Sequence, residues 1–164
     1  MEQLSQYSEA QMLIRKPVAA VFEAMANPEI TTNFWFTKSS GRLEPGKTII
    51  WEWEMYGVSA TIKVIEMVPN QKIVFEWQQP ARTVEFKFED IDGKATYFTA
   101  KESGYTESGD ELLNVIRDST GGFTTVLDGL KAYLEHNIRL NLIGDKFLKK
   151  MIQCKQILLP ICLK

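Results

Sequence analysis

The sequence has few of the residues that build most metal and nucleophilic sites. It contains one histidine and two cysteines, and the cysteines, Cys154 and Cys162, both lie close to its end, after His136. No CxxC pair and no HExxH motif occurs, so we expect no metal site and no cofactor. The N-terminus does not read as a signal peptide, and reduced thiols are the default, so the expected location is cytoplasmic.

Charge of one sign and long apolar runs are also missing. The chain has 19 Lys and Arg residues against 21 Asp and Glu residues, a net charge of −2. A general electrostatic affinity for nucleic acid is therefore not expected. No run of 18 apolar residues occurs, so we expect no membrane span. The length suits one domain, placed at 1–142 and followed by a basic, apolar tail at 143–164.

Aromatic residues and period-two alternation dominate the middle of the chain. Residues 6–15 alternate as a strand does, and two short helices are expected next, the second at 28–34. From 38 to 103 the apolar residues recur every second position, between turns such as Asp92-Gly93. This pattern predicts an antiparallel meander with strands at 48–55, 58–68, 72–78, 82–90 and 94–102, preceded by a short strand near 38–42.

Alternation makes one face of the predicted sheet apolar and aromatic and the other charged. Such a division is typical of an antiparallel sheet with one solvated face. The aromatic face holds our candidate wall residues, which are Trp51, Trp53, Phe75, Trp77, Phe86, Phe88 and Phe98.

A long helix is predicted at 109–142, with Ser108 or Asp110 as its cap. Its apolar stripe, which we expect to pack on the aromatic face, consists of Leu112, Ile116, Thr120, Phe123, Leu127, Leu130 and Leu134. The helix also carries Gly121, Gly122 and Gly129, although a mid-helix glycine costs roughly 1 kcal/mol relative to alanine. Small residues on the packing face of a helix either let another element approach the helix backbone closely or leave a gap beside it. The pattern alone is compatible with a solid aromatic core and with a ligand pocket.

Two carboxylates are candidate polar anchors. Glu102 is in phase with inward-facing Phe98 and Ala100. Glu66 continues the inward-facing alternation of its own strand, 58–68. Inward carboxylates could hold a ligand's hydroxyl or amine. Alternatively, both lie at solvated strand ends, and a bulge near Glu66 would turn it outward. Arg82 and Lys101 are expected to be exposed rim residues.

Three segments resemble one known family. IRKPVAAVFEAMANPE (14–29), TVEFKFEDIDGKATYFTAKESGY (83–105) and STGGFTTVLDGLKAYLEH (119–136) are similar to segments of the Hsp90 ATPase activator homologues of the START/Bet v 1-like superfamily. The family often has tryptophan at the place of Phe123 and a tryptophan pair where this chain has 34–36. The resemblance implies an α+β helix-grip fold. In this fold a curved antiparallel sheet wraps around a long C-terminal helix, two short helices follow the first strand, and a cavity lies between sheet and helix.

From these observations we expect non-catalytic binding of a small hydrophobic molecule, lipid-like or polyketide-like, between sheet and helix. Trp35, Gly122, Phe123 and Leu127 complete the candidate site with the wall residues and the two carboxylates. Alternatives are a chaperone-binding module, implied by the family, and a cyclase-like or hydrolase-like enzyme that pairs Glu66 with Glu102. The tail could pack on the domain, lack order or lie on a membrane surface.

Overall fold

The computed structural model describes residues 6–148, so most of the predicted tail lies outside the described residues. The elements are β1 (Tyr7–Ile14), α1 (Val18–Ala26), α2 (Pro28–Thr31), β2 (Lys38–Ser39), β3 (Thr48–Trp53), a 3-10 turn η1 (Glu54–Tyr56), β4 (Val58–Val68), β5 (Lys72–Trp77), β6 (Arg82–Ile91), β7 (Ala95–Ser103), α3 (Gly109–His136) and α4 (Leu142–Asp145).

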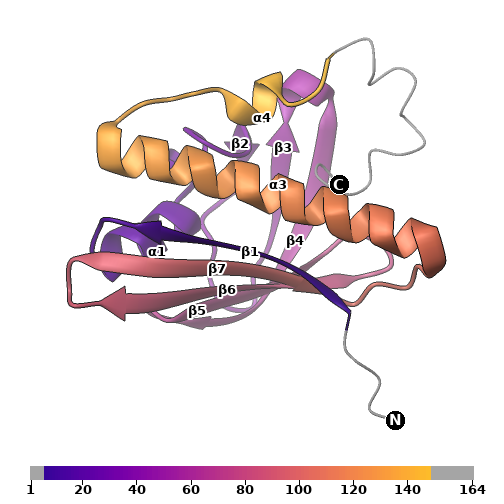
Figure 1. The fold of residues 1–164 in the computed structure, drawn as a ribbon, viewed down its shortest axis with the longest axis horizontal. Helices are drawn as coiled ribbons and strands as arrows, with labels where there is room; N and C mark the ends of the chain where they lie inside the picture. The colour runs from indigo at the N-terminus through magenta and orange to yellow at the C-terminus, as the bar shows by residue number, and fades with distance from the viewer. Residues whose placement is uncertain (1–5, 149–164) are drawn as a thin grey trace.

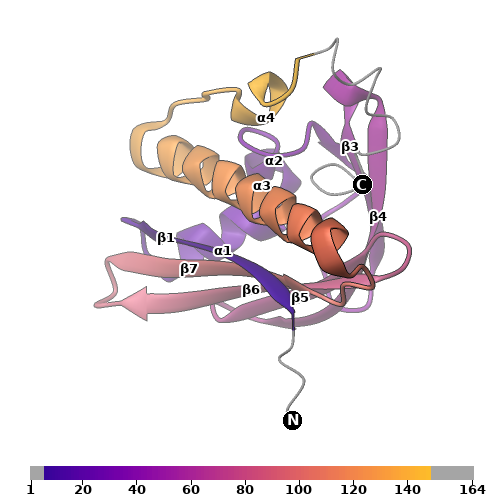
Figure 2. The same ribbon diagram turned by 45° about the vertical axis from the view of Figure 1, so that its right-hand side comes forward.

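The strands form one antiparallel sheet in the order β1-β7-β6-β5-β4-β3-β2. β3 to β7 pair in chain order, as tight turns favour, while β1 forms one edge of the sheet and pairs with β7, with Ala10 opposite Ala100. The sheet curves around α3, with β1 and β7 running beside the helix (Figures 1 and 2). The predicted α+β helix-grip fold is therefore confirmed.

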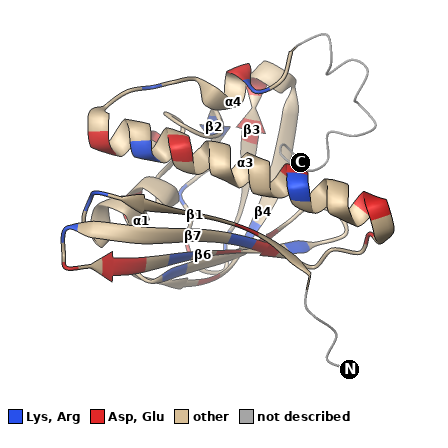
Figure 3. Ribbon diagram, in the orientation of Figure 1, with Lys and Arg blue, Asp and Glu red and all other residues tan. Residues whose placement is uncertain are grey.

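The core lies between the curved sheet and α3. Alternation along β5 buries Ile73, Phe75 and Trp77, and the same period along β6 buries Val84 and Phe86. The short helices α1 and α2 pack at one end of the layer between the sheet and α3. The segment Phe34–Phe36, which follows α2, is buried in the core. Acidic and basic residues are interspersed along α3 and along the strands of the sheet (Figure 3).

The long helix differs from its prediction in length and in the face that it buries. It ends at His136 rather than at 142, because Asn137 takes a left-handed conformation and donates its N–H to carbonyls of the last turn. In its first half the predicted Leu112 is buried, but the next two buried residues are Val115 and Ser119, one position before the predicted Ile116 and Thr120. A sheet twists, so the direction in which it faces the helix changes along the helix axis. The buried positions of α3 therefore shift around the helix and do not follow one straight apolar stripe.

Two functional classes can be addressed within the described part of the chain. No helix of residues 6–148 is long and apolar enough to cross a membrane. The same residues contain no group of three or more His, Cys, Asp or Glu side chains placed to hold a metal ion.

Candidate functional site

The glycines of α3 have different surroundings. A Cβ atom on Gly129 would lie 3.1 Å from both the Cβ and the carbonyl oxygen of Phe34, so the absence of a side chain lets α3 approach this segment. A Cβ atom on Gly121 would meet only the Lys146 ammonium, at 4.0 Å. Close approach therefore explains Gly129 but does not require glycine at 121.

Trp35 lies among the rings of the core between the sheet and α3. Its ring centroid lies 4.8 Å from that of Trp51, 6.0 Å from Phe86 and 6.3 Å from Phe123 of α3. Such tilted and edge-on ring pairs are favourable packing geometries. The structure thus brings the predicted aromatic wall together as a densely packed core around this tryptophan.

Almost all of the predicted wall is buried. Trp35, Trp51, Trp53, Phe75, Trp77, Phe86, Phe88, Phe98, Phe123 and Leu127 each have a solvent exposure of 4% or less. Gly122 is half-buried on α3. One member of this wall, Trp77, also lines a pocket in the sheet.

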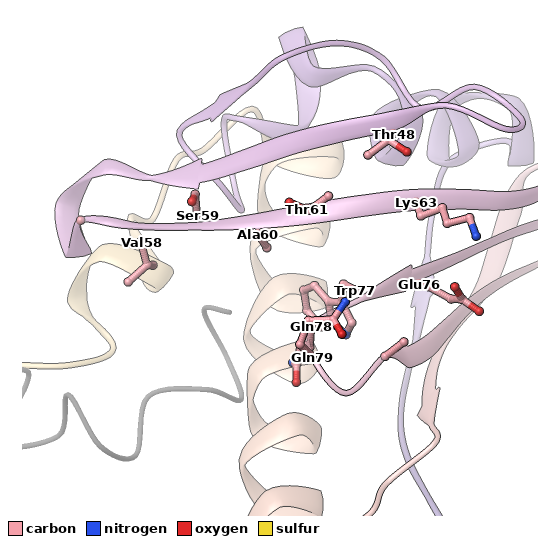
Figure 4. A pocket seen from close by; sticks show the side chains of 12 residues that line it. Thr48, Val58, Ser59, Ala60, Thr61, Lys63, Glu76, Trp77, Gln78 and Gln79 are labelled. Carbon is pink, nitrogen blue, oxygen red and sulfur yellow. The ribbon is translucent and has the colours of Figure 1, made fainter.

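The pocket lies where β4 and β5 separate. Their ladder begins at the pair Lys63–Glu76, whereas residues 58–61 of β4 pair with β3. The widening gap holds a pocket of about 800 Å³, which we call the β4–β5 pocket (Figure 4). Its lining residues are Thr48, Gly57, Val58, Ser59, Ala60, Thr61, Lys63, Glu76, Trp77, Gln78, Gln79 and Ala81. A volume of this size falls within the range of small-molecule sites.

The inward orientation of Glu102 is confirmed, because its exposure is 0%. One carboxylate oxygen accepts a hydrogen bond from Trp77 Nε1 at 2.7 Å. The other accepts from Ser119 Oγ at 2.5 Å and from the Tyr105 hydroxyl at 2.9 Å. These donors come from β5, from α3 and from the loop between β7 and α3, so Glu102 fixes the pocket-lining indole and joins the sheet to the helix.

Two further contacts complete this polar network. Ser8 of β1 lies 2.7 Å from Ser119 through their hydroxyl oxygens, and it accepts from the Tyr105 hydroxyl at 2.8 Å. Burial, reinforced by the neighbouring negative charge of Glu102, raises the pKa of Tyr105 to about 12. Tyr105 therefore remains a hydrogen-bond donor at neutral pH. The sequence analysis did not identify Ser8, Tyr105 or Ser119, because hydroxyl residues carry no distinctive periodic signal.

Of the two orientations left open for Glu66, the structure shows the outward one, and the inward alternative is wrong. A register shift between Val64 and Glu66 turns its side chain toward solvent, where it pairs with the Lys72 ammonium at 2.8 Å. The bulge inserts one residue and so reverses the side-chain alternation that follows it. Glu66 and Glu102 consequently do not meet, and the acid–base pair postulated for an enzyme does not form.

The prediction that Arg82 is exposed is also wrong, because only 4% of the residue is accessible. Its guanidinium pairs with Glu107 through Nη2 and lies 4.7 Å above the centre of the Tyr105 ring. The period of two already placed Arg82 in phase with Val84 and Phe86, so alternation could have found this burial. Lys101 is half-buried, with its ammonium 4.0 Å from the centre of the Tyr7 ring.

The order of elements and the buried aromatic face can now be compared with known proteins. The family described as Activator of Hsp90 ATPase homolog 1-like protein matches residues 15–135. This chain belongs to that family. The match spans the strands from β2 to β7 and nearly all of α3, which confirms the family resemblance of the sequence segments. No curated protein matches the chain significantly.

Solved structures agree on the fold. Protein SSP2350 from Staphylococcus saprophyticus is 30% identical over 82% of this chain and 96% of its own, with a TM-score of 0.73. The Aha1 dimer from Colwellia psychrerythraea is 18% identical over 80% of this chain and 97% of its own, with a TM-score of 0.68. DynU16, from the dynemicin biosynthetic locus, is 20% identical over 81% of this chain and 48% of its own, with a TM-score of 0.71.

Proposed function

We propose that this protein binds a small hydrophobic molecule and that the β4–β5 pocket is its binding site. The observation that carries the proposal is the pocket of about 800 Å³ at the opening of the sheet, with Trp77 in its lining. Burying the apolar surface of a ligand against an indole and aliphatic side chains supplies roughly 25 cal/mol per Å². The family and the helix-grip fold are compatible with such a binding module.

This site differs in position from the predicted one, which was the space between the sheet and the long helix. The rings around Trp35 fill the middle of the layer between the sheet and α3. The β4–β5 pocket is instead bordered by Ala60 and Trp77 and by polar residues such as Thr61 and Gln79. An apolar surface with a few polar groups is typical of small-molecule sites. The aromatic core then serves mainly as the rigid support of Trp77.

The test is fluorescence titration with N-phenyl-1-naphthylamine, an uncharged apolar dye whose emission increases away from water. Thr61→Trp places a large ring in the β4–β5 pocket at an exposed strand position, and we expect it to weaken dye binding at least tenfold. Lys87→Trp is the matched control, because it adds the same ring at an exposed position of β6 outside the pocket. Equal dye affinity in both folded variants would contradict the proposed site.

The two alternative functions remain predictions. A chaperone partner rests on the family description alone, and a pull-down with purified Hsp90 would test it directly. For a cyclase-like enzyme, the carboxylate postulated to pair with Glu102 is not beside it, since Glu66 faces solvent. We therefore propose a binding function without catalysis.

A further inference from the structure

One edge of β4 faces the β4–β5 pocket with its backbone. On the β3 side, Val64 donates its N–H to the Lys47 carbonyl at 2.9 Å and accepts from the Gly46 N–H at 3.0 Å. Successive residues of a strand direct their N–H and C=O groups to opposite sides. Ser59 and Thr61, an odd number of positions away from Val64, therefore direct theirs away from β3. Both residues line the pocket.

The ladder between β4 and β5 ends before it reaches these two residues. Its register would place Gln78 opposite Thr61 and Pro80 opposite Ser59. Gln78 has a φ of 70°, which turns the chain out of the strand direction, and Pro80 has no N–H. Figure 4 shows the chain bending away from β4 at this point. Within residues 6–148, the backbone groups of Ser59 and Thr61 thus have no partner strand.

An open strand edge accepts an extended peptide backbone. Main-chain hydrogen bonds to the added strand give affinity, and the pockets beside it select side chains. Among the lining residues, the cation Lys63 lies opposite the anion Glu76, so the charges of the lining balance. Backbone pairing and contact with the buried Ala60 and Trp77 therefore decide which peptide fits.

The described chain ends beside this edge. The ring centroids of Phe147 and Tyr56 are 6.0 Å apart, and Tyr56 is followed directly by Gly57, a lining residue of the pocket. The segment 149–155 reaches roughly 23 Å when extended. This reach exceeds the roughly 14 Å from Gly57 to Thr61 along β4. The residues after 155 can therefore be placed anywhere along the open edge.

The sequence after residue 155 contains an apolar run that suits a strand. Residues 157–159 read Ile-Leu-Leu, and Pro160 follows them directly. Proline cannot donate to a ladder, so it limits an added strand to the residues before it. We propose that residues 156–159 pair with the open edge of β4 and cover the β4–β5 pocket. This inference rests on the proposed binding function and adds its regulation, because the segment and the ligand compete for one site.

An antiparallel register satisfies both the backbone and the side chains. With Ile157 opposite Ala60, the two neighbours of Ile157 meet the free backbone groups of Ser59 and Thr61. The Ile157 side chain then points, like that of Ala60, to the inner face of the sheet. There it replaces water beside the indole of Trp77, which supplies the apolar part of the contact.

Hydrogen exchange of single amides, measured by NMR on the full chain, tests the pairing. In the wild type the amides of Ser59 and Thr61 should be protected. In Ile157→Lys they should exchange about tenfold faster or more, because a charged side chain is costly to bury and the added strand opens. The amide of Ala60, which faces β3, should stay protected in both proteins and is the internal reference.

Titration with N-phenyl-1-naphthylamine measures the competition. If the segment covers the pocket for about nine-tenths of the time, Ile157→Lys should bind the dye about tenfold more tightly than the wild type. Ile161→Lys is the matched control, since it makes the same substitution on the other side of Pro160. It should leave both the amide protection and the dye affinity unchanged.

Fast exchange of Ser59 and Thr61 in the wild type would overturn the inference. Protection that persists in Ile157→Lys would overturn it too, and so would protection that disappears on dilution, which would identify a second copy of the chain as the added strand. If protection is lost in Ile157→Lys while dye affinity stays the same, the segment does not regulate the pocket and the inference fails. If the amides behave as expected but neither protein binds the dye, the pairing holds and the proposed function fails.

Discussion

The two halves of α3 pack on the same sheet by different means. In the second half, Phe123, Leu127 and Leu130 join the aromatic core, and Gly129 lies against Phe34. In the first half, Leu112 and Val115 form a small separate cluster, and the helix is joined to the sheet by Ser119, which donates to the buried Glu102. One amphipathic helix thus combines a densely packed end with a hydrogen-bonded end.

The difference separates stability from positioning. Apolar burial is nondirectional and scales with area, so the ring-filled end contributes most of the stabilisation. The polar end contributes less, but its hydrogen bonds require particular atoms at particular distances, and a fully satisfied buried network specifies one arrangement. The β4–β5 pocket adjoins the polar end through Trp77, so the part of the molecule with the most directional contacts is the part that we expect to bind a ligand.

The largest effect is expected at the centre of the densely packed end. Trp35→Ala removes a ring that contacts rings from the sheet and from α3, and it should lower the free energy of unfolding by about 3–5 kcal/mol. Urea denaturation followed by circular dichroism measures this change. Trp35→Phe retains part of the packing and should lose clearly less. A loss below about 1 kcal/mol for the alanine variant would mean that this space is not tightly filled.

An intermediate effect is expected at the hydrogen-bonded end. Glu102→Gln keeps the shape of the side chain but leaves one oxygen to accept from the donors of Trp77, Tyr105 and Ser119, so stability should fall by about 1–3 kcal/mol. The Trp77 indole N–H, assigned with Trp77→Phe, should shift in its NMR resonance and exchange with solvent faster.

The control for Glu102 is Glu89→Gln, which neutralises an exposed carboxylate on β6. It should leave both stability and the indole resonance unchanged. An unaltered Trp77 resonance in Glu102→Gln would show that this carboxylate does not position the pocket wall.

The smallest effect is expected at Gly121 and is measured against Gly129, another glycine of α3. Gly129→Val inserts methyl groups against Phe34 and should destabilise the protein by about 1–3 kcal/mol. Gly121→Ala has room for its methyl group and removes the conformational penalty of glycine, so it should stabilise the protein by up to about 1 kcal/mol. Thermal unfolding of both variants shows whether each substitution lowers or raises the melting temperature. Equal signs would contradict the view that only Gly129 is required for close approach.

Local patterns predicted much of this molecule. Alternation in β5, β6 and β7 assigned Phe75, Phe86 and Phe98 to the interior, and it also placed Glu102 there, because side-chain direction in a regular strand depends only on position. At Glu66 the same reasoning left two orientations open, because one extra residue in a bulge reverses the faces and alternation alone does not show whether the bulge forms. At Arg82 the period was correct, but the usual exposure of arginine was given more weight than the alternation.

The sequence by itself therefore determined most of the elements and the aromatic face, because periodicity, turns and burial of apolar surface act locally or on whole faces. The helix-grip fold followed from the resemblance of three segments to a known family. Only the tertiary structure decided that Trp35 fills the middle, that Glu102 collects its donors from three segments, and that β4 separates from β5 to form a pocket. These outcomes depend on sheet curvature and on contacts between residues distant in the chain, such as Ser8 with Ser119. Such contacts exist only after the sheet has closed around α3.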